Sequence, residues 1–159
     1  MVDEDLSDCL FSFLHQMESL ASLRVSHSNV LAYDNGLKML NKTMIKEVRE
    51  VWLVHCYLNA GHCKILADGL MKMKKLAIFR MRNQIKLGKG LGAIVYNLSF
   101  HNNLEILDLQ DISLDQPANP NSPSITELVT SLQKFIKINS NVSILKLIKI
   151  EGLNPKFTQ

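Results

Sequence analysis

The sequence has no apolar run of the roughly 18 to 20 residues that a membrane-spanning helix requires, which argues against a membrane protein. Cysteine is scarce too, and three cysteines cannot all pair with one another. The N-terminus is acidic and lacks the basic and apolar segments of a secretory signal. These absences predict a reducing, cytoplasmic setting. Three short acceptor motifs for N-glycosylation, beginning at Asn41, Asn97 and Asn141, point the other way.

A strong excess of one charge is also missing, because 18 Lys and Arg residues stand against 15 Asp and Glu residues. This mild positive balance is compatible with an acidic partner but falls far short of a domain that binds nucleic acid through its phosphates. Only four prolines interrupt the chain, and three of them lie between residues 115 and 123. Since 47% of the 159 residues are hydrophobic, we expect one domain with a continuous core over residues 1–159.

A short apolar pattern recurs along the chain with a fixed period. Each copy is an apolar residue, two variable residues, an apolar residue, one variable residue and a last apolar residue. The last apolar residues are Val25, Leu53, Met81 and Leu109, three steps of 28, and a fifth copy ends at Leu147, 38 residues further on. The longer step is 28 plus an insertion of 10, most of which is residues 115–123. We expect that insertion to be an exposed, proline-rich loop.

Helical spacing fills the stretches between these copies. Counting back 15 and 11 residues from the last apolar residue of a copy finds apolar pairs: Leu10 and Leu14, Leu66 and Leu70, Ile94 and Leu98, Leu132 and Ile136. Such i, i+4 pairs predict the buried face of a helix. The stretch before Leu53 has Lys38 and Lys42 at these offsets, so we expect an irregular helix that uses Leu37, Leu40 and Met44 instead.

Two helix starts are expected from capping residues. One is Ser7, which follows acidic residues at the N-terminus. The other is Ser124, since Glu127 three residues later would complete a capping box.

A unit of one strand and one helix cannot bury both elements alone, so copies are expected to stack. Over nearly its whole length the chain resembles the leucine-rich repeat family, specifically the long, helix-containing repeats of the ribonuclease inhibitor type, with the best match over residues 48–73. The resemblance implies an α/β solenoid: a curved parallel sheet of about five strands with helices on the convex side. We expect an N-terminal helix at 3–17 and strands near 22–26, 50–54, 78–82, 106–110 and 144–148. The alternative is an accidental period in a leucine-rich α/β protein.

The chain departs from the family pattern just after each strand, where the family places a small polar residue that satisfies the turn. Those positions hold Ser28, Cys56, Gln84, Ile112 and Ile150, and the last two have no polar group to offer. Lys86 and Gly152 replace an expected apolar residue two positions later. We therefore expect the turns to become less regular toward the C-terminus.

Alternation along the strands predicts which residues face outward onto the concave surface. The candidate partner-binding residues are Arg24, Trp52, Ile78, Arg80, Arg82, Asp108 and Lys146. Trp52 is the only tryptophan, and Trp and Arg dominate the energetics of interfaces. The alternative is that Trp52 stacks with Arg24 and Arg80 in a local cation–π contact and binds nothing.

Other motifs have structural explanations that compete with functional ones. His55-Cys56 and His62-Cys63 contain zinc-type ligands, but the period places Cys56 in a buried turn and Cys63 at a helix start. The glycines of residues 87–92 fit a tight turn better than a phosphate loop, although an anion at the following helix N-terminus stays open. His27 and His55 are equivalents on adjacent strands, where a pH-sensitive contact competes with a solvated pair.

No Ser or Cys nucleophile can be paired with a base from the spacing, so we expect no catalytic residue, no metal and no cofactor. The family resemblance implies a protein-protein interaction module, a scaffold or sensor that binds another protein. A regulator of a partner enzyme, such as a small-GTPase activator, is the alternative from the fold, although no acidic tail is present. A nucleic-acid surface would use the outward arginines and lysines, but the isoleucines between them favour a protein partner.

Overall fold

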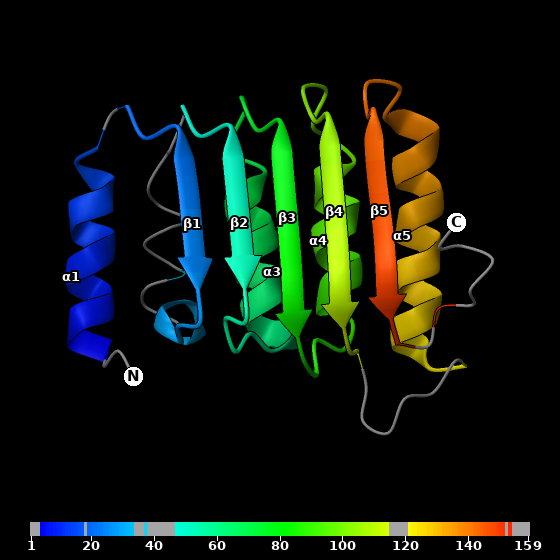
Figure 1. Ribbon diagram of the computed structural model, residues 1–159, viewed down its shortest axis with the longest axis horizontal. Coiled ribbons are helices and arrows are strands. Elements are labelled where there is room, and N and C mark those ends of the chain that lie inside the picture. The colour runs from blue at the N-terminus through cyan, green and yellow to red at the C-terminus, as the bar shows by residue number, and fades with distance from the viewer. Residues whose placement is uncertain are drawn as a thin grey trace.

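The computed structural model describes residues 4–17, 19–33, 37, 47–114, 121–151 and 153. Five parallel strands form one sheet in the order β1-β2-β3-β4-β5 (Figure 1). The strands are β1 (Ser22–Ser26), β2 (Glu50–Val54), β3 (Ile78–Gln84), β4 (Ile106–Ile112) and β5 (Ile144–Ile150). The helices are α1 (Glu4–His15), the 3-10 helix η1 (Val30–Ala32), α3 (Ala60–Leu70), α4 (Gly90–Leu98) and α5 (Pro123–Ile138). Among these described helices, none combines the length and the hydropathy that a membrane crossing requires.

The predicted α/β class with a five-stranded parallel sheet is confirmed. Each strand pairs in parallel with the next in the chain, and equivalent residues of the 28-residue period stand side by side. One such row is Leu23, Val51, Phe79, Leu107 and Leu145. β1 and β2 have the expected bounds, whereas β3, β4 and β5 extend two residues further.

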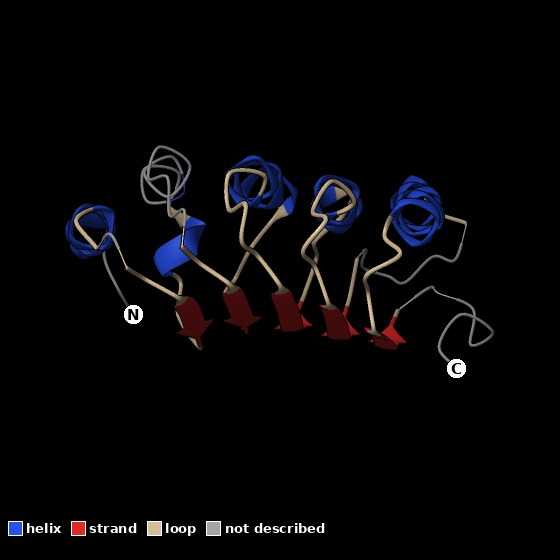
Figure 2. Cartoon of the chain, turned by 90° about the horizontal axis from the view of Figure 1, so that it is seen from above, coloured by secondary structure: helices blue, strands red, loops and turns tan. Residues whose placement is uncertain are grey.

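The helices α3, α4 and α5 all lie on one side of the sheet (Figure 2). The core fills the space between the two layers and consists of the inward strand residues and the apolar helix residues. Among the described elements, no helix covers the opposite side of the sheet, which we call the open face.

Both members of a predicted apolar pair are buried in α3 and α4. Leu66, Leu70, Ile94 and Leu98 belong to the core. In the outermost helices the expectation is wrong for Leu10 and Ile136, which are exposed, whereas Leu132 is buried and Leu14 packs against the core. Among the described helices, α4 lies between α3 and α5, whereas α5 has a described helix on one side only.

The start of α5 corrects the predicted capping box. Ser122 is the N-cap, and its hydroxyl accepts a hydrogen bond from the backbone N–H of Ile125. Pro123 follows as the first helical residue, a position where its fixed φ is suitable and its missing N–H costs nothing. Ser124 is therefore inside the helix.

A capping box forms instead at α3, where no serine or glutamate signals it. The Asn59 side chain accepts from the His62 N–H at 2.9 Å, and His62 Nδ1 accepts from the Asn59 N–H at 3.3 Å. The other expected start was also wrong, because α1 begins at Glu4 and not at Ser7. The predicted irregular helix around residues 37–44 lies outside the described residues, except that Leu37 is buried. Of the predicted loop at 115–123, residues 115–120 also lie outside them, and the expectation is wrong for Pro123, which is the first residue of α5.

A left-handed residue occupies the same position of every unit, directly after β1 and β2 and one residue before the end of β3, β4 and β5. These are His27, His55, Asn83, Asp111 and Lys149, with φ between 48° and 52°. Asn, Asp and His tolerate this region better than most residues, which would have been a usable signal. Gln84, Ile112 and Ile150 stay paired in register just beyond this point, so the loss of the polar turn residue does not disturb the sheet.

Candidate functional site

Trp52 is held between two arginines at the N-terminal half of the open face. Arg24, Trp52 and Arg80 are register partners on β1, β2 and β3. The guanidinium carbons of Arg24 and Arg80 lie 4.3 and 4.1 Å from the centre of the indole ring. Both distances are within the range of cation–π contacts, so the local stack that the sequence offered as an alternative is present. Contact with a partner at this place stays a prediction.

Asp108 forms ion pairs with Arg80 and Arg82. It is only 2% exposed, and its carboxylate accepts a 2.5 Å hydrogen bond from Arg82 Nη2 and lies 3.9 Å from Arg80 Nε. Gln110 donates to the other carboxylate oxygen at 2.6 Å. The expectation that Asp108 is an accessible contact residue is therefore wrong, because two long arginine side chains fold over it. Its role is to orient those arginines.

A second carboxylate holds the outer arginine. Arg24 Nη2 donates to Glu50 at 3.2 Å, and the Ser22 hydroxyl donates to the same carboxylate oxygen. The Arg24 side chain nevertheless stays largely exposed. With Arg82 and Lys146, which are also accessible, it leaves the open face with more exposed positive than negative charge.

An apolar row runs beside the Trp52 stack. Ile78, Ile106 and Ile144 are register partners on β3, β4 and β5, in the row that begins with Ser22 and Glu50. Their exposure increases along the sheet, from partial at Ile78 and Ile106 to 40% at Ile144. The open face thus offers an aromatic centre, exposed cations and an aliphatic row within one surface.

Three rings gather at the carboxyl ends of β1 and β2. The rings of His27 and His55 stack with centres 5.6 Å apart, and Tyr57 meets His55 edge-on at 4.8 Å. This is the adjacent pair that the period predicted, and Tyr57 is an addition that the sequence pattern did not indicate.

The candidate zinc motif has a structural explanation. His62 is engaged in the cap of α3, and both Cys56 and Cys63 are buried. Burial raises the pKa of the Cys56 thiol to about 11 and that of the Cys63 thiol to about 12. Cys56 donates to the Val25 carbonyl oxygen at 3.4 Å. Within the described part of the chain, no three His, Cys, Asp or Glu side chains gather in a way that could hold a metal ion.

The glycines of the 87–92 segment serve the turn and the packing of α4. Gly88 has a φ of 53°, the left-handed conformation that the turn requires. A Cβ on Gly90 would lie 2.5 Å from the Cβ of Cys63, so only glycine lets α4 approach α3 this closely. Both positions have a structural reason to be glycine.

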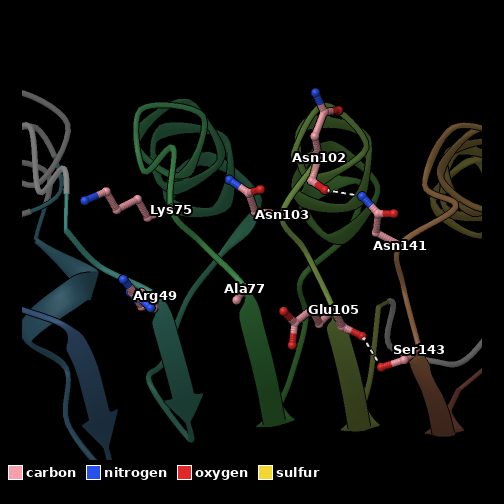
Figure 3. Close-up of a pocket in the computed structure, with 8 residues that line it drawn as sticks. All are labelled: Arg49, Lys75, Ala77, Asn102, Asn103, Glu105, Asn141 and Ser143. Atoms are coloured by element: carbon pink, nitrogen blue, oxygen red, sulfur yellow. Dashed lines mark hydrogen bonds between the residues drawn. The ribbon is translucent and has the colours of Figure 1, made fainter.

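A polar hollow of about 610 Å³ lies at the opposite ends of the strands, where each strand begins (Figure 3). Its lining residues are Arg49, Lys75, Ala77, Asn102, Asn103, Glu105, Asn141 and Ser143. The Asn141 amide donates to the Asn102 carbonyl oxygen, and the Ser143 hydroxyl donates to that of Glu105 (Figure 3). These bonds tie adjacent units together across the hollow. Sequence reasoning missed this row, although Lys75, Asn103 and Asn141 each stand three residues before a strand.

No protein-family model matches the chain, and no curated protein matches it either.

Proposed function

We propose that this chain is a leucine-rich repeat module of the ribonuclease inhibitor type, a curved solenoid that binds another protein on its concave, open face and has no catalytic activity of its own. The in-register parallel sheet with a 28-residue period and helices on one side supports this assignment. Three free cysteines support a reducing, cytoplasmic setting.

The single observation that carries the proposal is the Trp52 stack on a face that no described helix covers. A tryptophan already fixed between Arg24 and Arg80 loses little conformational freedom when a partner binds, so less of the binding energy is spent on ordering it. Trp and Arg are also the residues most enriched among those that dominate binding. Carboxylates below and beside the stack hold the arginines in place.

The chemistry of the face defines the partner that it fits. Exposed Arg24, Arg82 and Lys146 favour an acidic surface. The row of Ile78, Ile106 and Ile144 requires apolar side chains in the same partner, which a nucleic acid backbone does not supply. We therefore expect an acidic and partly apolar protein surface.

Substitution of Trp52 by Ala tests the proposal. Partners captured from cell lysate with the wild-type chain are identified by mass spectrometry, and their affinities for purified variants are then measured by calorimetry. Trp52→Ala should cost about 2 kcal/mol of binding, or about 30-fold in Kd. The free energy of unfolding of the variant should be lower by about 1 to 2 kcal/mol, because the two cation–π contacts are lost.

Tyr96→Ala is the matched control, since Tyr96 is an exposed aromatic residue on α4, on the helical side of the sheet. It should leave the affinity unchanged. Equal affinities for wild type and Trp52→Ala, or a larger loss with Tyr96→Ala, would place the partner surface elsewhere.

A further inference from the structure

The C-terminal end of the sheet has apolar positions that equivalent units bury. Leu145 of β5 is 38% exposed, whereas Val51, Phe79 and Leu107 in the same row are fully buried. Ile136 of α5 is 61% exposed, whereas its equivalents in α3 and α4 lie in the core. A strand position and a helix position are thus uncovered together.

At the other end of the sheet the strand position is covered, although Leu10 of the outer helix α1 is exposed. Leu23 is the equivalent of Leu145 on the opposite edge strand, β1, yet it is only 7% exposed. The helix α1 lies beyond β1 in Figure 1, and its residue Leu14 packs against the core. Lying at the edge of the sheet is therefore not enough to explain the exposure of Leu145.

Further exposed apolar residues cluster at the β5 end. Ile138 of α5 and Ile144 and Ile148 of β5 are all exposed. No described strand pairs with the outer side of β5, so its outward backbone N–H and C=O groups are free to pair with another strand. A long, apolar edge strand of this kind is a site of association.

We infer that this chain forms a symmetric dimer in which β5 and α5 of one copy pack against β5 and α5 of a second copy. A two-fold axis perpendicular to the sheet sets the two β5 strands antiparallel and the two α5 helices side by side. One partner then covers both Leu145 and Ile136. An extended peptide would cover the strand edge alone, and an isolated helix would cover α5 alone.

The register follows from the same residues. Opposite residues of an antiparallel pair lie on the same face. A register with Leu145 opposite its own copy buries the exposed leucine and sets Lys146 opposite Ile144. Registers that place Lys146 opposite itself bring like charges together, which destabilises the pair. The same symmetry puts both open faces on one side of the dimer.

The size of this surface predicts a weak dimer. A strand of seven residues is about 23 Å long, and a strand layer with a helix layer is about 20 Å deep. The contact is therefore about 450 Å² per partner, or about 900 Å² in total, which is at the lower limit for specific association. We expect a Kd on the order of 10 micromolar.

Sedimentation velocity with the whole chain, from about 1 to about 300 micromolar, brackets that Kd. The wild type should pass from monomer to dimer. Ile136→Glu should weaken the dimer at least about tenfold, since it buries a charge in the contact. Phe13→Glu is the matched control, because Phe13 is 58% exposed on α1 at the opposite end, and it should leave the equilibrium unchanged.

A disulfide tests the register in a Cys9→Ser background, which removes the exposed natural thiol. Leu145→Cys should form a covalent dimer, because opposite Cα atoms lie about 4.5 to 5.5 Å apart. Ile148→Cys on the same strand should not, because its two copies would be about 20 Å apart. A monomer at every concentration, a dimer weakened by Phe13→Glu and not by Ile136→Glu, or cross-linking through Ile148→Cys alone overturns the inference.

Discussion

Gly90 is where a single added methyl group should separate two helices. An ideal Cβ at Gly90 lies 2.5 Å from the Cβ of Cys63 and 3.0 Å from the Cα of Ala60. Both atoms belong to α3 and neither is the end of a flexible side chain, so α4 must move away from α3. Overpacking of this kind costs about 1 to 3 kcal/mol, and more where backbone must move.

The intrinsic helix preference of alanine acts in the opposite direction by at most about 1 kcal/mol. The net expectation for Gly90→Ala is a loss of about 2 kcal/mol, which lowers the Tm of a domain of this size by about 4 to 8 °C. Urea unfolding followed by circular dichroism measures the free energy, and thermal melting measures the Tm. A variant as stable as the wild type would refute the proposed close contact between the helices.

Two controls separate the contact from a general effect of alanine. Gly61→Ala in α3 meets only the Asn59 side-chain oxygen, at 3.3 Å, and should be neutral or stabilising by up to about 1 kcal/mol. Cys63→Ala should not rescue Gly90→Ala, because alanine keeps the Cβ that makes the closest contact. Rescue would instead assign the clash to the sulfur atom.

Three further predictions concern buried groups. At about pH 8, Ellman's reagent should modify Cys9 rapidly, whereas it should modify Cys56 and Cys63 only upon unfolding. The reason is that burial raises the pKa of the Cys56 and Cys63 thiols. Rapid reaction of a second thiol in the folded chain would contradict this prediction. Burial, aided by Lys74, lowers the pKa of His101 below 6.5 in the folded chain. As the pH drops below that value, His101 binds a proton more readily in the unfolded chain than in the folded one, so the free energy of unfolding should fall. His101→Gln should flatten this part of the stability profile, and a curve parallel to that of the wild type would exclude His101 as its cause. Gln84→Ala removes the acceptor of the buried Cys56 N–H and should cost about 1 to 3 kcal/mol in urea unfolding, whereas Gln133→Ala on the exposed side of α5 should cost almost nothing.

The strands were predictable because their signal is local and periodic. Residues such as Leu53 and Met81 recur every 28 positions, and parallel pairing in register is how such equivalents stand side by side. The burial of Leu66 and Leu70 followed from the i, i+4 spacing. The Trp52 stack was also foreseeable, since its three residues occupy one position of the period.

Other features depended on neighbours that the pattern does not show. The same spacing that buries Leu98 leaves Ile136 exposed, because α4 lies between two described helices and α5 has a described helix on one side only. Asp108 occupies an outward position and is still buried, because Arg80 and Arg82 fold over it. The Asn59–His62 cap was missed because histidine at the third helical position is not a usual capping signal.

The sequence by itself determined the number of strands, their spacing and the face on which each side chain lies, since alternation and period are properties of the chain. Only the tertiary structure decided which outward residues remain accessible and which edge stays uncovered. A long side chain such as Arg82 forms its ion pair with a group that is close in space, which the sequence pattern does not show. The exposure of Leu145 likewise depends on what lies beside β5.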